Sequence, residues 1–573
     1  MLKNPEESEV VRVALAPLPA IIWTSATGNS FRESASFRMT APFMDNGCFL
    51  VIRIRKTATS AIATMVTITD QIAIVLFPAI RFLSYDLLIL RCFFLSGLWS
   101  LDFVIYILVP PLYRTGTSFK TREVDNPLIP SRRKLLKQIA GAGICFPFAR
   151  WGARPLLAEV STKLAFPAPF PQPTVLSAED DPFLDELERL NSCFFWEQAN
   201  PQTGLIRDRS KVTGNDNGIV ASIASTGFGL TALCIAAHRG YLSLLEARGR
   251  VLTTLRFLWK KLPHHRGFFY HFANINTGER LWDSEVSSVD TAILLCGILT
   301  CRQHFEYAEI THLAYDIFNR VDWTWLSEDT SLLPHGWTPE FGFLPYRWDY
   351  YSELMMMYLL GLGSASHPLR PETWDAWKRL TFEYAGLRYV GSFAPLFVHQ
   401  YSQAWFDFRD KRDRYADYFR NSIIATDVHR RFCIELSRQF PDYSDDLWGI
   451  TASDSQRGYV AWGGPPVTGP LDGTVVPSAS AGSLPFLPQP VMRVLKNIRN
   501  SYGSAWSRYG FVNAFNPLKN WYDSDVVGID TGITMLMAEN ARSGFVWNTF
   551  MKLPEAQRGM NLAGFKREQT AAM

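Results

Sequence analysis

Cysteine and charged residues are scarce in this chain of 573 residues. Only 8 residues are Cys, and Asp, Glu, Lys and Arg together make up 19%. The sequence contains no CxxC pair and no HExxH motif, which argues against a disulfide framework and against a zinc site. The formal net charge of +3 is too small to indicate nucleic acid as a partner. We therefore expect a globular protein that uses no metal ion or cofactor and binds no nucleic acid.

Hydrophobic and aromatic residues, in contrast, are abundant. They make up 47% and 14% of the chain, and the aromatic residues are 18 Trp, 21 Tyr and 40 Phe. Most of these rings are expected in the core. The remainder suit a surface that stacks against sugars or other organic ligands, because Trp and Tyr combine a flat apolar ring with a polar group.

A motif typical of protein export lies well inside the chain. Residues Ser131–Lys137 read SRRKLLK, the uncharged stretch Gln138–Ala149 follows, and small residues occur near Leu156–Ala158. This order is typical of a twin-arginine signal peptide. We therefore expect residues 131–158 to be a signal peptide and the protein to be periplasmic or secreted by the twin-arginine route.

The 130 residues before this motif allow two interpretations, since an export signal belongs at an N-terminus. In one, the extension 1–130 is real and anchors the protein in a membrane through Cys92–Val109, eighteen residues with Asp102 as their one charge. That length is at the lower limit for a membrane span. In the other, which we favour, the start codon is assigned too far upstream. We expect the protein to have a membrane as a partner only if the extension and its segment Cys92–Val109 are real.

The chain from Asp180 onward alternates between two kinds of predicted helix. Amphipathic helices, with charges on one face, are predicted at Ser243–Lys261, Ala308–Trp325 and Arg420–Phe440. Uncharged segments rich in small residues, typical of helices buried on all sides, are Ala221–Ala237, Val286–Thr300, Glu353–Gly363, Gly528–Ala541 and the shorter His399–Phe408 and Pro477–Leu484. Six inner and six outer helices in alternation predict an all-α (α/α)6 toroid. We expect it to form a single catalytic domain, 159–573, and to be a monomer.

Polar and aromatic residues gather in the loops that enter the predicted inner helices. These loops contain Asp208–Ser210, Trp282–Glu285, Tyr346–Asp349, His399–Tyr401, Asp472–Thr474 and Gly528–Asp530. Parallel inner helices would place all these entrances at one end of the ring. Carboxylates beside Trp and Tyr at one opening are typical of a glycan-binding cleft.

A series of motifs follows the same order along the chain as in a known protein family. They are Ala224–Leu230, Arg266–Phe272, Trp282–Ala292, His335–Glu340, Phe343–Asp349, His399–Tyr401, Tyr509–Phe511 and Gly528–Asp530. From about Phe183 to Phe565, the chain thereby resembles the bacterial glycoamylase-like domain family. That family includes the endo-β-1,2-glucanases of glycoside hydrolase family 144 and is similar to the transglycosylase domain of cyclic β-1,2-glucan synthases. It implies an (α/α)6 fold, no metal ion and an acid–base glycosidase mechanism.

Glycoside hydrolysis requires one carboxyl that donates a proton and one carboxylate that activates water or attacks the sugar. Glu285 and Glu353 each lie at the entrance of a predicted uncharged helix and are our candidates for the acid and the base, with Asp283 as a third essential carboxylate. Desolvation at such a position raises the pKa of a carboxyl towards the working range. The alternative for each residue is a carboxylate that only caps the helix or favours its dipole.

A larger set of residues is predicted to bind the substrate. Polar side chains would form hydrogen bonds to sugar hydroxyls, and Trp rings would stack on sugar faces. The alternatives are loop anchoring for the polar residues and core packing for the rings. The set is Arg209, Trp282, Trp337, Arg347, Trp348, Asp349, His399, Gln400, Tyr401 and Trp405.

The predicted activity is hydrolysis of an oligo- or polysaccharide, a β-glucan and in particular β-1,2-glucan. Inversion of configuration is expected from the resemblance alone. Two alternatives remain open: a retaining β-1,2-glucan transglycosylase, and a non-catalytic glycan-binding protein that uses the same cleft.

Overall fold

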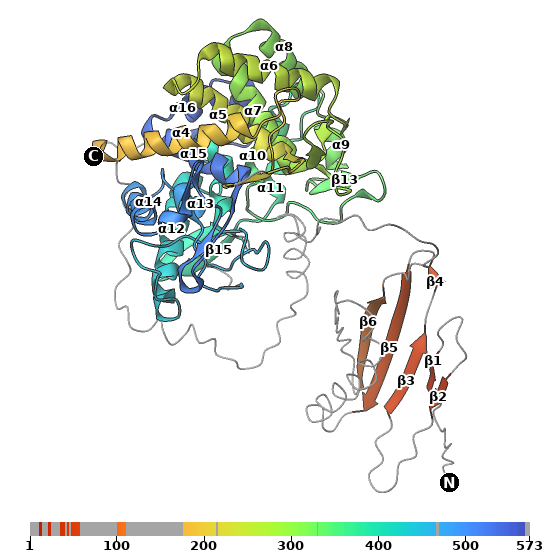
Figure 1. Ribbon diagram of the computed structural model, residues 1–573. Coiled ribbons are helices and arrows are strands. Elements are labelled where there is room, and N and C mark those ends of the chain that lie inside the picture. The colour runs from red at the N-terminus through yellow and green to blue at the C-terminus, as the bar shows by residue number, and fades with distance from the viewer. Residues whose placement is uncertain are drawn as a thin grey trace, which may run out of the picture. The chain divides into compact units, whose positions relative to one another are not determined.

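The computed structural model describes residues 176–213, 216–328, 330–392, 395–465 and 469–567, together with six strands between residues 11 and 109 (Figure 1). The chain divides into two units, Met1–Asp125 and Asn126–Met573. The twin-arginine motif and the predicted signal peptide, 131–158, lie outside the described residues. Their assignment stays a prediction.

The first unit is described by its strands alone. β1 (Val11–Val13) pairs with β2 (Ile21–Trp23), and β5 (Gly47–Thr57) pairs with three strands, all antiparallel: β3 (Ala35–Thr40), β4 (Phe43–Met44) and β6 (Ser100–Val109). The second part of the candidate membrane segment is β6, and residues 92–99 lie outside the described part. Within the described residues, no helix has the length and apolar character needed to cross a membrane.

The second unit is rich in helices, and its inner helices begin close to the predicted positions. These helices carry small, uncharged residues along most of their length, and α5 and α7 are buried on nearly every side. Figure 1 shows them in the centre of the unit. They are α5 (Ile223–Arg239), α7 (Ser288–Phe305), α10 (Met355–Gly363), α13 (Pro477–Ala481) and α15 (Gly528–Arg542).

The prediction of an inner α-helix at His399–Phe408 is wrong. The chain forms two 3₁₀ helices there, η3 (Leu396–His399) and η4 (Tyr401–Ala404). Tertiary hydrogen bonds explain the difference, because Gln400 bonds the start of the α13 region and the Ser402 hydroxyl bonds the backbone oxygen of Glu353. These contacts hold the segment in short turns.

The outer helices are amphipathic, as predicted, but several differ in length. The stretch Ala308–Trp325 breaks into α8 (Ala308–Asn319) and α9 (Trp323–Ser327), and the stretch Arg420–Phe440 is α12 (Tyr418–Glu435) followed by η5 (Leu436–Arg438). The other helices are η2 (Ala178–Asp180), α4 (Asp181–Glu197), α6 (Leu244–Lys260), α11 (Thr373–Ala376), α14 (Pro488–Ser501), η6 (Gly503–Ala505), η7 (Pro517–Lys519), α16 (Phe545–Phe550) and α17 (Pro554–Leu562).

The strands of this unit are short and form small antiparallel sheets. They are β7 (Arg209–Lys211), β8 (Val220–Ser222), β9 (His264–His265), β10 (Phe268–Phe269), β11 (Phe272–Asn274), β12 (Val286–Ser287), β13 (Gly336–Thr338), β14 (Gly342–Phe343), β15 (Leu380–Tyr384), β16 (Leu387–Gly391), β17 (Lys411–Arg412), β18 (Trp506–Ser507), β19 (Gly510–Phe511), β20 (Phe515–Asn516), β21 (Trp521–Tyr522), β22 (Asp525–Val527) and β23 (Lys566–Arg567).

Helices α5 and α7 approach each other closely at two glycines. A Cβ atom on Gly297 would collide with the backbone of Gly227, and one on Gly227 would collide with the backbone of Ile293 and Leu294. The two backbones therefore touch, which is why these positions require glycine. Farther along the same pair, the thiols of Cys234 and Cys301 lie 3.6 Å apart.

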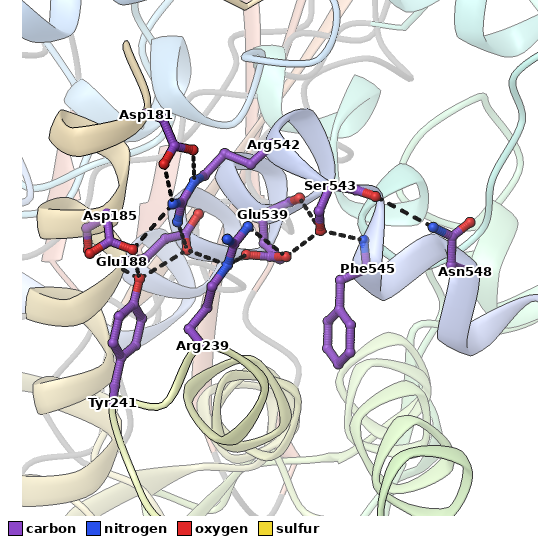
Figure 2. A network of polar contacts seen from close by, with 10 residues as sticks. All are labelled: Asp181, Asp185, Glu188, Arg239, Tyr241, Glu539, Arg542, Ser543, Phe545 and Asn548. Carbon is purple, nitrogen blue, oxygen red and sulfur yellow. Dashed lines mark hydrogen bonds and ion pairs between the residues drawn. The ribbon is translucent and has the colours of Figure 1, made fainter. Parts of the chain in front are cut away.

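A buried charged network joins the last turns of α5 and α15 to α4 (Figure 2). Arg239 of α5 bonds both carboxylate oxygens of Glu539 of α15, at 2.7 and 3.1 Å. Arg542 of α15 bonds Glu188 of α4 at 2.6 Å. Glu188 and Glu539 have fully buried side chains. The three helices are thus tied at the end opposite to where α5 and α15 begin.

The same network contains more carboxyl groups than guanidinium groups. Arg542 also bonds Asp181, at 2.8 and 3.0 Å, and Asp185, at 3.1 Å. Burial, followed by the neighbouring charge of Glu539, raises the pKa of Glu188 well above its ordinary value. A proton on Glu188 removes the repulsion between the two buried glutamates, since a neutral carboxyl can donate a hydrogen bond to Glu539.

We expect Arg542→Met to destabilise the helical unit far more than Arg256→Met. The Arg542 side chain is only 2% exposed, and its removal leaves the buried carboxyl of Glu188 without this guanidinium partner, at a cost of about 3 kcal/mol. Arg256 binds Glu309 equally closely, with two bonds of 2.6 Å, but on the exposed surface, where an ion pair contributes little. Urea denaturation of both variants measures the difference, and equal losses would contradict this account.

Candidate active site

Three inner helices begin side by side, because each follows a short strand and these strands belong to one hydrogen-bonded series. β22 leads into α15 and pairs with β7; β8 leads into α5 and pairs with β11; β12 leads into α7 and pairs with β13. Single bridges, Arg207 to Ala221 and Tyr270 to Val286, connect the pairs to one another. We call this series the entrance edge. It brings polar residues from distant parts of the sequence together.

Glu285 lies at the entrance edge, immediately before β12, in a cluster with His271 and Asp290. Its side chain is buried, and its Oε1 lies 3.3 Å from Nδ1 of His271. The other ring nitrogen, Nε2, lies 3.6 Å from Oδ2 of Asp290. Asp290 also accepts a hydrogen bond from Ser287, the N-cap of α7. The imidazole therefore lies between two carboxyl groups and can exchange a proton with either.

The turn before Glu285 has an unusual backbone. Trp282 and Asp283 both have positive φ, 56° and 48°, a conformation that disfavours large side chains. Arg280 stabilises the turn by donating to the backbone oxygens of Asp283, at 2.7 Å, and Ser284, at 2.6 Å. Trp282 and Asp283 are both exposed. Their predicted roles, stacking and catalysis, stay predictions.

Glu353 lies just before α10, the inner helix that follows α7 along the chain. Its side chain is buried. The hydroxyl of Ser402 donates to its backbone oxygen at 2.9 Å, which anchors this entrance to η4. Trp348 links the loop that enters α10 to α7, because the indole Nε1 of Trp348 donates to the Ser288 hydroxyl at 2.9 Å. Burial also raises the pKa of Asp349 in the same loop. The entrances of α7 and α10, with Glu285 and Glu353, are thus neighbours.

The remaining aromatic and cationic candidates near these entrances have internal partners. The Trp348 ring stacks on His335, with ring centres 4.0 Å apart, and the half-buried Trp337 ring stacks on His265 at the same distance. Arg347 donates to Glu328 at 2.7 Å.

Two of the predicted substrate-binding residues have contacts that disagree with that role. Trp405 has no exposed surface, and its indole donates to Thr231 of α5 at 3.0 Å, so its ring belongs to the core and cannot stack on a sugar. Gln400 is buried, and its amide donates to Ala479 and Ser483, both at 2.8 Å. Its amide nitrogen anchors the α13 region instead of facing a cleft.

The other two residues of this segment are also buried. The ring of Tyr401 packs edge-on against Phe228, with centres 5.5 Å apart. His399 Nδ1 lies 3.1 Å from the Tyr351 hydroxyl, and burial lowers the pKa of His399 to about 3. This histidine is therefore neutral at ordinary pH.

A second group of carboxylates, of which the sequence analysis did not identify Asp523 and Asp525, surrounds Arg209 at β7. The Arg209 guanidinium lies 2.5 Å from Asp454, 3.2 Å from Asp208 and 3.7 Å from Asp525. Asp454, Asp523 and Asp525 each offer an oxygen within 4.8 Å of the others. Arg209 was predicted from sequence to bind the substrate, and in the structure it holds carboxylates from two distant loops together.

Asp523 is the most perturbed carboxyl of this second group. Burial, and then the charges of Asp454 and Asp525, raise its pKa to about 8. Its Oδ2 and Oδ1 of Asp454 are buried without a hydrogen-bond partner among the described residues. A carboxyl that keeps its proton at neutral pH can donate it, so this group has the character of a general acid.

The two groups also contain the donor sets within the described residues that could hold a metal ion. One is His271, Glu285 and Asp290, and the other is Asp454, Asp523 and Asp525. In the second set, Arg209 already supplies one positive charge beside these carboxylates.

Asp523 should make stability depend on pH. Its pKa of about 8 exceeds the ordinary 3.8, so the folded chain keeps a proton that the unfolded chain loses between these values. The contribution of Asp523 to the free energy of unfolding has its full value below about pH 4 and decreases as the pH rises to about 8. Asn mimics the protonated form. We therefore expect Asp523→Asn to lose less stability than the unchanged protein between about pH 5 and about pH 9, measured by urea denaturation. Parallel pH profiles would show that Asp523 is not protonated.

Comparison with known proteins shows which family this arrangement resembles. Residues 345–554 match the Glycoamylase family model, described as "Putative glucoamylase". A curated relative from Parabacteroides distasonis, an exo β-1,2-glucooligosaccharide sophorohydrolase acting at the non-reducing end, is 29% identical over 427 residues. The match covers 68% of this chain, and the chain spans only 58% of the length of that relative.

Solved structures give the same result. An endo-β-1,2-glucanase from Chitinophaga pinensis, in complex with sophorotriose and glucose, is 28% identical with a TM-score of 0.64, covering 68% of this chain and 99% of its own. A Bacteroides uniformis protein described as a "putative glucoamylase" is 28% identical with a TM-score of 0.65, covering 69% of this chain and 99% of its own. The predicted resemblance to the glycoamylase-like family is therefore confirmed.

Proposed function

We propose that this protein is a glycoside hydrolase that cleaves β-1,2-glucan by carboxylate acid–base catalysis. The observation that carries the proposal is the buried cluster of Glu285, His271 and Asp290 at the entrance of α7, three residues from the exposed ring of Trp282. The cluster supplies proton exchange, and the ring supplies a surface for a sugar. The activities of the relatives from Parabacteroides and Chitinophaga support β-1,2-glucan as the substrate.

We propose an (α/α)6 toroid as the architecture that holds this site. Contacts between α5 and α7, α7 and α10, α13 and α15, and α15 and α5 support a ring of inner segments, with η3 and η4 in the fourth position. The hydroxyl of Thr451 accepts from Phe397 of η3, and Gly449 of the same loop accepts from Val476 at the start of α13. These two bonds link the fourth and fifth positions.

Glu285 and Glu353 are the acid–base pair in this proposal. Both are buried, and burial favours the neutral carboxyl that a general acid requires. An inverting reaction also requires a water molecule between the sugar and the base, with the two carboxyl groups about 6.5–9.5 Å apart. Asp283, exposed on the turn that carries Trp282, is the third carboxylate and would contact the sugar from the open side.

We expect the protein to release short oligosaccharides from linear β-1,2-glucan, and not from starch, laminarin or cellulose. Glu285→Gln and Glu353→Gln should each lower the rate about 10²- to 10⁴-fold, the usual contribution of a general acid or base. Reducing-end assays measure the rate. Glu309→Gln, at an exposed carboxylate on α8, is the matched control and should retain the full rate.

The products distinguish the alternatives. A β-anomer released first from the β-linked substrate indicates retention, and products longer than the substrate indicate a transglycosylase. A folded protein that binds β-1,2-glucan but releases no product, with binding unchanged in both Gln variants, would indicate a non-catalytic glycan-binding protein. No binding and no release would reject the proposal.

We also propose that Ser131–Lys137 directs export by the twin-arginine route, on the sequence pattern alone. Replacing Arg132 and Arg133 together by Lys should keep the protein in the cytoplasm of a bacterial host that exports the unchanged chain. Arg189→Lys, at an exposed position of α4 outside the motif, is the control. Fractionation followed by immunodetection measures the distribution, and export of the paired variant would reject the proposal.

A further inference from the structure

We propose that Trp282 and Phe341 form an outer binding surface for a glucan chain, beside the bond that is cleaved. This surface, which we call the outer aromatic surface, holds sugar units beyond those at the carboxylates. The inference rests on the proposed function for its substrate class, and it adds a residue, Phe341, that no catalytic argument requires.

The first observation is the exposure of the two rings. Phe341 is 88% exposed and Trp282 is 62% exposed, the highest values for aromatic residues in the described part of the chain. Exposure of such rings costs free energy, because water hydrates them poorly. Two strongly exposed rings on loops that flank one strand pair therefore indicate a ligand that covers them.

The second observation is that both loops flank the strand pair next to Glu285. β12 follows Glu285 directly and pairs with β13, with Val286 opposite Trp337. Trp282 lies on the turn before β12, and Phe341 lies on the turn between β13 and β14. A chain that passes over the two turns can reach the carboxylates of the entrance edge.

The third observation is a connection that fixes the two turns relative to each other. Arg280 donates to both carboxylate oxygens of Glu340, at 2.5 and 3.0 Å, and also to the backbone oxygens of Asp283 and Ser284. One guanidinium thus holds the residue before Phe341 and the residues after Trp282. The two turns that carry the rings are therefore held relative to each other before a ligand arrives, which lowers the entropy cost of binding.

The chemistry of this surface fits an uncharged sugar chain. Arg280 neutralises Glu340, so the connection between the two rings adds little net charge. The ring of Trp282 meets Phe272 edge-on, with centres 5.1 Å apart, an arrangement that does not cover both faces of the indole. Flat apolar faces beside hydrogen-bonding groups suit the alternating C–H and O–H surfaces of glucose units.

The test compares long and short substrates with the full chain. We expect Phe341→Ala to raise KM for polymeric β-1,2-glucan about three- to tenfold, the effect of one lost ring contact, and to raise KM for a β-1,2-linked trisaccharide less. Trp282→Ala should act in the same direction. Tyr315→Ala, which removes another exposed ring, on α8, is the matched control and should leave both values unchanged.

Electrophoresis in gels that contain linear β-1,2-glucan provides a second measurement that does not depend on catalysis. The unchanged protein should be retarded relative to a gel without polysaccharide, and Phe341→Ala should be retarded less. If the unchanged protein is retarded, Phe341→Ala is retarded less and neither cleaves the glucan, the proposed function fails while the binding surface stands; equal retardation of the two proteins overturns the inference. If the protein cleaves β-1,2-glucan and Phe341→Ala matches it in both measurements, the inference is overturned while the function stands.

Discussion

The close contact between α5 and α7 is the constraint on which the rest of this structure depends. Gly227 and Gly297 allow the two backbones to touch, so neither helix has room there for a side chain. Small, uncharged residues fill the remaining interface, and both helices are buried nearly all round. Helices packed in this way cannot carry charged side chains along their length, because a buried charge needs a partner, whereas single hydroxyls such as that of Thr231 find one. The charged groups of α5 and α7 are therefore confined to their end turns.

The two ends of the inner helices use this polar chemistry differently. At the last turns of α5 and α15, Arg239 and Arg542 bind buried glutamates and hold α4 in place. At the entrance edge, short strands lead into the helices and serines cap α5 and α7, and the positive end of the α7 dipole favours a carboxylate such as Asp290. One end therefore stabilises the fold, and the other can hold carboxyl groups whose protons are exchanged.

The sequence predicted what depends on local pattern and missed what depends on distant contacts. The inner helices α5, α7 and α15 were predictable because uncharged small residues continue over four turns. Trp405 and Gln400 were assigned to the cleft because a sequence pattern cannot distinguish the cleft side of a segment from its core side. Asp523 and Asp525 were missed because no periodicity connects them to Arg209. The burial of Asp523 arises only where segments far apart in the sequence meet Arg209.

The two carboxylate groups differ in the nitrogen-containing side chain beside them, and this difference bears on their chemistry. His271 lies between Glu285 and Asp290, and an imidazole can both accept and donate a proton, so it can pass a proton between them. Arg209 remains charged and cannot take part in such an exchange. The proton in its group must therefore reside on a carboxyl, which is Asp523. The first group can therefore pass a proton from one residue to another, whereas the second keeps its proton on one carboxyl.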